Sequence, residues 1–370
     1  LKIIWIGLEL KNIWAGLFAI CLLFLIPSYY NQTLTFQSDI LITTFSLLSL
    51  VTIIKFRKNF QLCWFIISTI FLNLAFWTKF DITFFPSFIF ILFFLFKEKE
   101  VSIKKIINLF LTFFAVSLGF FLIFILPFGI KEVFSNSILL RFQAASNASP
   151  SFLLFNYLKK DTVLLLIILG SLFLSFFKKN KFNFSFKIIF LWCIFVLIIF
   201  IFYRPLFPHH LVILTVPMVL LFSQLLEQCF SNKKLFKFMI LIILILSLTN
   251  RIYITAKTST KLINDSQQNA IKIIEKHTNI NDFVVSDEEI LNGLSGRLPP
   301  PELSDVSQVR IKSNNLSPEK FKKIIDIYKP KLIIPWNGRL KSIKNFSEVI
   351  KDYKIIYLSS DFQKIILLRQ

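Results

Sequence analysis

The sequence predicts a polytopic α-helical membrane protein with a small C-terminal α/β domain. Three observations support this fold class: 55% of the 370 residues are apolar, the mean hydropathy is +0.68, and long apolar runs alternate with short basic tracts. Soluble domains contain about 45–50% apolar residues, so a chain this apolar cannot bury its side chains in a water-soluble core. Lipid must therefore solvate much of the chain.

The net charge of +21 is compatible with two kinds of partner, nucleic acid and membrane. Nucleic-acid-binding proteins gather basic residues on a water-facing surface. Here many of the Lys and Arg residues lie in short tracts between apolar runs, which is the pattern that the positive-inside rule produces in membrane proteins. We therefore expect membrane lipid, and no nucleic acid, as a partner.

Nine apolar runs have the length of membrane spans. A transmembrane helix needs about 20 apolar residues, and somewhat fewer where flanking side chains reach the interface. The chain begins with Leu1 and its opening segment looks like the end of a span, so we expect that an N-terminal portion is missing from this sequence. The nine expected spans lie near 13–30, 38–54, 61–77, 82–96, 106–126, 162–177, 188–203, 211–227 and 238–250.

Most basic residues of the short loops between spans collect on one side when the nine spans alternate across the membrane. The positive-inside rule makes this side cytoplasmic, and we expect a multi-pass protein of the cytoplasmic (inner) membrane. The loops at 31–37, 78–81, 127–161 and 204–210, and all residues after Arg251, then face outward. The basic residues on the cytoplasmic side are Lys55, Arg57, Lys58, Lys97, Lys99, Lys104, Lys105, Lys178, Lys179, Lys181, Lys187, Lys233, Lys234 and Lys237.

The composition changes sharply after Arg251, where the long apolar runs stop and charged, Asn-rich sequence begins. We therefore divide the chain into a multi-span domain, 1–254, and a soluble extracytoplasmic domain, 255–370. Strands that alternate with helices predict an α/β fold with a mixed sheet for the second domain. Helices are expected at 266–277, 317–328 and 345–353, and strands at 282–287, 331–336, 354–359 and 364–369.

Ionisable residues at the outer membrane boundary are candidate site residues, because burying a charge in lipid is costly unless it is paired or faces a cavity. Asp39 begins a span. It is either an ordinary acid at a helix N-terminus, where the macrodipole favours it, or an acid that lines a site. Lys79 and Asp81 lie in a tight outward turn, where they form a structural ion pair or, through Lys79, contact a lipid phosphate.

Arg204, His209 and His210 lie together at another outer boundary. Arginine offers a bidentate fork and histidine can donate hydrogen bonds, so this group suits a phosphate or diphosphate. The alternative is that these residues anchor a helix at the interface. Adjacent histidines do not share one face of a helix, so we expect at most one of them in a given site. Arg141 lies in the loop at 127–161, which is too long for a simple connector and is therefore a candidate functional loop.

The sequence predicts no metal site and no certain cofactor. The four cysteines lie in or beside apolar runs, which indicates neither a zinc site nor a disulfide framework. The two adjacent histidines and the outer-boundary acids do not have the spacing of metal ligands. A requirement for a divalent metal is left open.

Four stretches of the chain, in this order, resemble the C-type (GT-C) membrane glycosyltransferases, the group that includes protein O-mannosyltransferases and bacterial aminoarabinose transferases of lipid A. The pattern G-R-x-P-P-x-x-L-x-D-x-S at 296–307 is the most distinctive and makes Arg297 a candidate substrate-loop residue, beside Asp81 and Arg141. The four stretches are AGLFAICLLFLIPSYYNQ, which leads to Asp39, then FWTKFDITFFPSFIFIL, RPLFPHHLVILTVPMVLL and SGRLPPPELSDVSQVRI.

The resemblance implies transfer of a hexosyl or pentosyl group from a polyprenyl-phosphate-linked donor to an acceptor hydroxyl outside the cytoplasm, with inversion at the anomeric carbon. The acceptor would be a glycan, a lipid or a protein. Lys79, Arg204, His209 and His210 would bind the donor phosphate, and Asp39 would be a catalytic acid near the donor or acceptor sugar. The phosphate needs cationic groups as it leaves, and the acceptor hydroxyl needs a nearby carboxylate.

The chain departs from these glycosyltransferases at one place. They carry paired acids in the first outer loop, and no such loop precedes Lys11 in this sequence. Asp39 matches the position of a further active-site acid, so we expect the general base in the missing N-terminal portion.

Two other classes of function are considered. A polytopic transporter or lipid flippase would place its ionisable groups near the bilayer midplane and often shows internal repeats. Here the charges gather at the outer boundary and no repeat is visible. A non-catalytic membrane scaffold would keep the fold without the paired acids.

Overall fold

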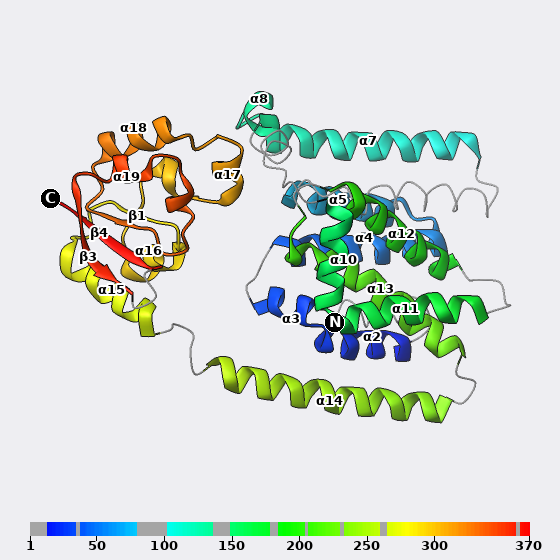
Figure 1. The fold of residues 1–370 in the computed structure, drawn as a ribbon. Coiled ribbons are helices and arrows are strands. Elements are labelled where there is room, and N and C mark those ends of the chain that lie inside the picture. The colour runs from blue at the N-terminus through cyan, green and yellow to red at the C-terminus, as the bar shows by residue number, and fades with distance from the viewer. Residues whose placement is uncertain are drawn as a thin grey trace. The chain divides into compact units, whose positions relative to one another are not determined.

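A computed structural model of the chain describes residues 13–34, 38–79, 102–135, 149–177, 184–203, 206–229, 233–259, 265–359 and 363–370 (Figure 1). The chain divides into two compact units. One unit combines Leu1–Val133 with Ser146–Thr255, and the other combines Phe134–Ala145 with Ala256–Gln370.

The first unit is helical throughout its described residues. Segments predicted as spans form helices wherever they are described, and the predicted span at 82–96 lies outside the described residues. The predicted span at 13–30 is interrupted, because Pro27 lacks a backbone N–H and begins a new helix. The helices are α2 Ile13–Leu25, α3 Pro27–Leu34, α4 Ser38–Asn59, α5 Leu62–Lys79, α7 Ile103–Ile125, α8 Ile130–Phe134, α10 Pro150–Lys160, α11 Thr162–Phe177, α12 Phe184–Phe202, the 3-10 turn η2 Pro208–His210, α13 Leu211–Cys229 and α14 Lys233–Ser259.

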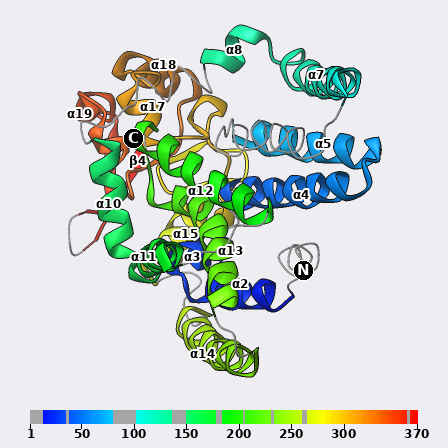
Figure 2. The same ribbon diagram turned by 90° about the vertical axis from the view of Figure 1, so that its right-hand side faces the viewer.

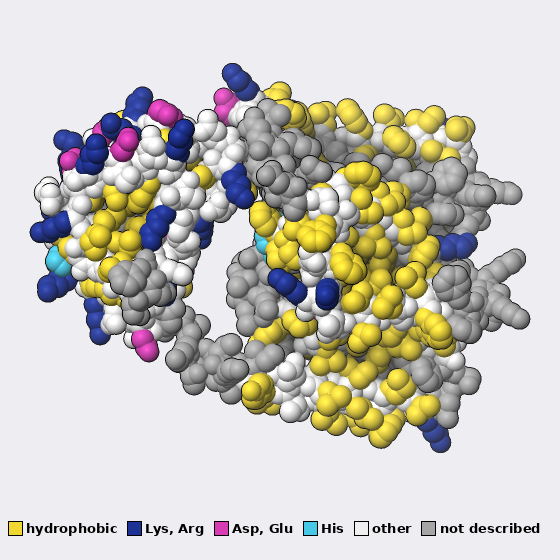
Figure 3. Space-filling model, viewed as in Figure 1, with side chains coloured by type: hydrophobic (Ala, Val, Ile, Leu, Met, Phe, Trp, Pro, Cys, Tyr) yellow, Lys and Arg dark blue, Asp and Glu magenta, His cyan; other side chains and the backbone are white. Residues whose placement is uncertain are grey.

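Three helices of the described residues are long and apolar enough to cross a membrane by length and composition, namely Ser38–Asn59, Ile103–Ile125 and Pro208–Cys229. Shorter apolar helices accompany them. Hydrophobic side chains cover much of the face of this unit seen in Figure 3. These features belong to a mostly helical membrane protein.

Helix α13 is the most buried of the three long helices. Buried residues make up 83% of its most apolar window, compared with 67% for α4 and 6% for α7. Helices α2, α4, α11 and α12 pack around α13 (Figure 2). A helix that is apolar on all sides is stable only when neighbours or lipid cover it. Helix α13 is therefore the central element of this unit. The surrounding helices fix the position of the residues at its N-terminal end.

Hydrogen bonds between small polar side chains join α4, α5 and α7. The hydroxyl of Ser49 bonds to Ser68 across the interface of α4 and α5, with 2.9 Å to the carbonyl oxygen and 3.0 Å to the hydroxyl. Asn73 of α5 donates to the hydroxyl of Ser117 on α7 at 3.1 Å. Such bonds let membrane helices associate where burial of apolar surface gives little driving force.

The second unit contains a four-stranded mixed sheet with strand order β1-β2-β4-β3. Strands β1 and β2 are parallel, and the other two pairings are antiparallel. Its elements are α15 Asp265–His277, β1 Val284–Ser286, α16 Glu289–Ser295, η3 Pro301–Leu303, α17 Gln308–Lys312, α18 Pro318–Tyr328, β2 Leu332–Ile334, η4 Leu340–Ser342, α19 Phe346–Val349, β3 Tyr353–Leu358 and β4 Ile365–Arg369.

Alternate residues of β1 and β2 face two separate hydrophobic clusters. Val285 and Ile333 belong to a cluster with Phe321 of α18. Val284 belongs to a second cluster with Ile274 of α15. Successive side chains of a strand point to opposite faces of the sheet, so the two clusters lie on opposite faces. Helix α18 covers one face and α15 the other, and all residues of β1 and β2 are buried.

Asp287 fixes the loop that follows β2. Its buried carboxylate accepts hydrogen bonds from the backbone N–H groups of Trp336, Asn337 and Leu340, at 2.6, 2.8 and 3.0 Å. A buried charge is tolerated when hydrogen bonds replace its hydration. Asp287 therefore has a structural role at the carboxyl end of the parallel pair.

Candidate functional site

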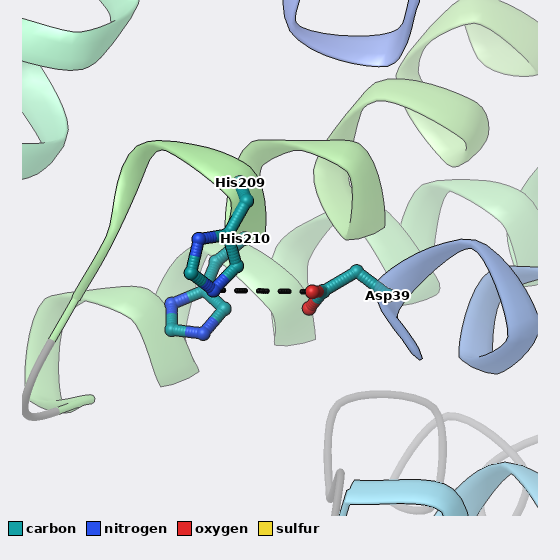
Figure 4. Close-up of side chains that lie close together, drawn as sticks. All are labelled: Asp39, His209 and His210. Carbon is teal, nitrogen blue, oxygen red and sulfur yellow. Dashed lines mark ion pairs between the residues drawn. The ribbon is translucent and has the colours of Figure 1, made fainter. Parts of the chain in front are cut away.

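Asp39 lies in the first turn of α4 and is fully buried. The positive end of the helix macrodipole favours an acid at this position, which was one of the two interpretations of the sequence. Its own backbone carbonyl accepts a hydrogen bond from the hydroxyl of Thr43 at 2.6 Å. The carboxylate does not point into an apolar environment, because it faces His209 and His210, which lie far from it in the sequence (Figure 4).

His209 and Asp39 form a pair at ion-pair distance. Nε2 of His209 lies 3.9 Å from Oδ2 of Asp39, which is longer than a direct hydrogen bond. The side chain of His209 is 27% exposed and that of Asp39 only 1%, so the pair is accessible from the histidine side. Catalytic contacts often tighten when substrate is bound, so this distance is compatible with a catalytic pair.

His210 is buried and held by its ring neighbours. Its Nδ1 accepts a hydrogen bond from the backbone N–H of Phe207 at 3.1 Å. The rings of Tyr203 and His209 stand edge-on to the His210 ring, with centroids at 5.0 and 4.4 Å. In a neutral imidazole, a nitrogen that accepts leaves the proton on the other nitrogen. His210 therefore presents Nε2–H as a hydrogen-bond donor.

Both histidines reach Asp39, which corrects the expectation that at most one of them would enter a given site. One ligand atom from each of Asp39, His209 and His210 lies within 4.8 Å of the others. The expectation assumed a regular α-helix, but the two residues form part of the 3-10 turn η2, which precedes α13. The two imidazole rings lie edge-on with centroids 4.4 Å apart, and both are close to Asp39.

Helix α10 supports the segment that carries the histidines. The hydroxyl of Tyr157 donates to the carbonyl oxygen of Leu206 at 3.2 Å. Next to it, the buried Asp161 accepts from the backbone N–H of Leu164 at 3.2 Å and from that of Ser28 at 3.0 Å. Asp161 was not among the sequence candidates, although an acid directly before an apolar run is a known helix N-cap signal.

The three residues fit a metal ion poorly as a complete ligand set. Catalytic zinc sites use about three protein ligands, each with a free lone pair. In His210 the lone pair of Nδ1 accepts from Phe207, so Nε2 carries a proton. Only Asp39 and His209 then offer lone pairs. The cluster therefore combines one N–H donor with two groups that accept hydrogen bonds, a combination that can contact a hydroxyl group.

The other sequence candidates fall into two groups. Arg297 lies in the second unit, where its guanidinium donates to Thr278 at 2.9 Å and to the carbonyl oxygen of Ser295 at 2.7 Å. These bonds fix the chain of its own domain. Asp81, Arg141 and Arg204, and the side chain of Lys79, lie outside the described residues.

Comparisons with known proteins agree with the resemblance seen in the sequence. Residues 3–130 match the family model described as dolichyl-phosphate-mannose-protein mannosyltransferase. The matched segment contains Asp39, whereas both histidines lie beyond its end. No curated protein matches the chain. The family match supports a GT-C-like glycosyltransferase, and together with the apolar helices it indicates a membrane enzyme of that type.

Proposed function

We propose that this chain transfers a sugar from a polyprenyl-phosphate-linked donor to an acceptor hydroxyl on the outer side of the membrane, with inversion at the anomeric carbon. The observation that carries the proposal is the buried Asp39 carboxylate, which faces His209 and His210 where α4 and α13 begin. The match of residues 3–130 to a mannosyltransferase family gives the class of reaction.

The role of each side chain follows from the hydrogen bonds that it can donate or accept. A carboxylate only accepts hydrogen bonds, so Asp39 would hold a hydroxyl of the acceptor or of the donor sugar. The Nε2–H of His210 would donate to the leaving phosphate, and His209 would do the same when protonated beside Asp39. Lys79 and Arg204 remain proposed phosphate ligands on the sequence argument alone.

The position of the site along the helices supports an outward-facing reaction. Asp39 opens α4, and Arg57 and Lys58 occupy its last turn, about 27 Å further along at 1.5 Å per residue. That separation is close to the thickness of the hydrocarbon core. By the positive-inside rule the basic end is cytoplasmic, so the acid and the histidines lie at the outer boundary.

The same position argues against a transporter. Transporters bind substrates near the bilayer midplane, at broken helices and repeat interfaces. Here the ionisable cluster lies at helix beginnings, in the first turn of α4 and just before α13. A transferase acts on a phosphate at the level of the lipid headgroups while the polyprenyl tail stays in the lipid. The position of the ionisable cluster at the beginnings of α4 and α13 agrees with such a reaction.

A transfer assay tests the proposal. The full-length protein is reconstituted in liposomes with a polyprenyl-phosphate donor that carries a labelled sugar, and the label is followed into glycan, lipid and protein fractions. We expect label in one fraction for the wild type and strong loss for Asp39→Asn. Thr52→Val serves as the matched control, because Thr52 is a buried polar residue of the same helix that bonds only within α4. Movement of the donor across the bilayer without sugar transfer would establish a flippase instead.

A further inference from the structure

The peptide group between Leu206 and Phe207 is hydrogen-bonded on both sides. Its carbonyl oxygen accepts from the hydroxyl of Tyr157 at 3.2 Å, and its N–H donates to Nδ1 of His210 at 3.1 Å. In a trans peptide the C=O and the N–H point in opposite directions, so the two side chains lie on opposite sides of one rigid group. A continuous chain of hydrogen bonds therefore connects Tyr157 to the imidazole of His210.

The end of helix α10 holds the Tyr157 hydroxyl in place. The backbone N–H of Asp161 donates to the carbonyl oxygen of Tyr157 at 3.0 Å, and the Asp161 carboxylate joins this turn to Ser28. The Tyr157 ring packs against the hydrophobic core of the helical unit. Burial also raises the pKa of its hydroxyl, which therefore stays protonated and able to donate. The first bond of the chain thus comes from a fixed donor.

The ring of Phe207 contacts both histidines of the site. It is stacked on the His209 ring, with centroids at 5.4 Å and an angle of 16° between the two planes. It also lies against the His210 ring, with centroids at 5.7 Å. Stacked aromatic pairs favour particular relative orientations of their rings. A movement of the Leu206–Phe207 peptide would therefore disturb both imidazoles that face Asp39 (Figure 4).

We propose that Tyr157 is a positioning residue of the sugar-transfer site, which acts on His210 through the Leu206–Phe207 peptide group. A donor bound to the carbonyl oxygen makes the N–H of the same peptide a stronger donor, because hydrogen bonds in a chain polarise one another. The stronger bond to Nδ1 holds the proton of His210 on Nε2 and makes that N–H a better donor in turn. Tyr157 thereby strengthens the bond from His210 to the leaving phosphate without contacting the substrate.

Histidine NMR spectroscopy tests the link between Tyr157 and His210 without a transfer assay. The full-length protein is labelled with nitrogen-labelled histidine, and the His210 signals are identified by their absence from His210→Asn. We expect the Nε2–H tautomer in the wild type. In Tyr157→Phe, which loses only the hydroxyl, the Nδ1 signal should move towards that of a nitrogen with a weaker hydrogen bond. A fluorotyrosine at position 157, whose hydroxyl is a stronger donor, should move this signal in the opposite direction.

Transfer kinetics measure the consequence for the reaction, and this part of the proposal rests on the proposed function. Tyr157→Phe should lower kcat roughly 3- to 10-fold, the rate equivalent of one neutral hydrogen bond, and should change KM by less than about twofold. Tyr353→Phe is the matched control, because the Tyr353 hydroxyl also donates to a backbone carbonyl, that of Pro330 at 2.7 Å, but in the second unit. The control should leave kcat and the His210 signals unchanged.

The two measurements separate failure of this proposal from failure of the proposed function. Unchanged His210 signals in folded Tyr157→Phe would overturn the proposal even if the wild type transfers sugar. A raised KM with unchanged kcat, or an equal loss of kcat in Tyr353→Phe, would also overturn it. Shifted His210 signals in a protein that transfers no sugar would refute the proposed function and would support the link between Tyr157 and His210.

Discussion

The carboxylate of Asp161 accepts a hydrogen bond from the backbone N–H of Ser28 at 3.0 Å, although 133 positions separate the two residues in the sequence. Its other oxygen accepts from Leu164 in the first turn of α11 at 3.2 Å. One side chain thus satisfies N–H groups at the beginnings of α3 and α11. The N-termini of helices leave such donors without intrahelical partners, so this residue stabilises two helices at once.

Replacement of Asp161 should lower the stability of the helical unit, and by more for alanine than for asparagine. An N-cap contributes about 1 kcal/mol, so Asp161→Ala should cost about 2 kcal/mol and Asp161→Asn, which keeps one acceptor oxygen, should cost less. Thermal unfolding of the detergent-solubilised protein measures the difference. Ser149→Ala removes the single cap of α10 and should have a smaller effect than Asp161→Ala. Equal melting temperatures for all variants would contradict the double cap.

Two substitutions of His210 should separate its structural role from its role as a donor. In His210→Asn the amide oxygen can replace Nδ1 as the acceptor for Phe207, but no group replaces Nε2–H. We expect this variant to fold normally and to lose roughly 100-fold in transfer, the loss typical of one missing oxyanion donor. His210→Gln places an amide near the Nε2 position and should retain more activity. If His210→Asn transfers sugar at the wild-type rate, His210 only positions the loop.

Metal removal should leave the reaction intact. The proton on Nε2 of His210 leaves Asp39 and His209 as the two lone-pair donors of the cluster. Dialysis against a strong chelator should therefore leave transfer within about twofold of the untreated protein, on the view that protein groups stabilise the phosphate. Loss of activity that returns when a divalent metal is added would refute this assignment and would require the other tautomer of His210.

Cysteine labelling in intact cells should locate the beginning of α5 and the second unit relative to the membrane. Cys63 is exposed in the first turn of α5, and Ser342 is exposed in the second unit. In chains with one cysteine each, an impermeant reagent should label Ser342→Cys in intact cells and Cys63 only after permeabilisation. The reverse pattern would invert the topology and would move the Asp39 cluster to the cytoplasmic side.

Much of the fold follows from local patterns. Residues 332–334 and the pair Val284 and Val285 are short apolar runs typical of strands buried on both faces, and they lie in β2 and β1. Ser317 before Pro318 predicts a helix start, and the Ser317 hydroxyl does accept from Lys320 at 3.2 Å. These features depend on neighbouring residues, so the sequence alone contains the necessary information.

The site depends on contacts that no local pattern contains. The sequence shows that Asp39 and His209 are unusual for a membrane boundary, but the packing of α13 beside α4 brings them together. The closeness of both histidines to Asp39 and the double cap by Asp161 depend on the relative positions of helices that lie far apart in the sequence. Arg297 was a candidate substrate-loop residue from the sequence, and only the structure shows that its guanidinium makes hydrogen bonds to Thr278 and Ser295.

A double-mutant cycle on Asp39 and His209 tests the central claim most directly, because the claim is that these side chains act together on one substrate. The cycle compares sugar transfer from the labelled polyprenyl-phosphate donor by the wild type, Asp39→Asn, His209→Gln and the double variant, with folding checked by monodispersity. We expect the transfer rate of each single variant to fall roughly 30- to 1000-fold. The rate of the double variant should be close to that of the less active single variant. Wild-type transfer by either folded single variant, or losses that multiply in the double variant, would contradict a shared site.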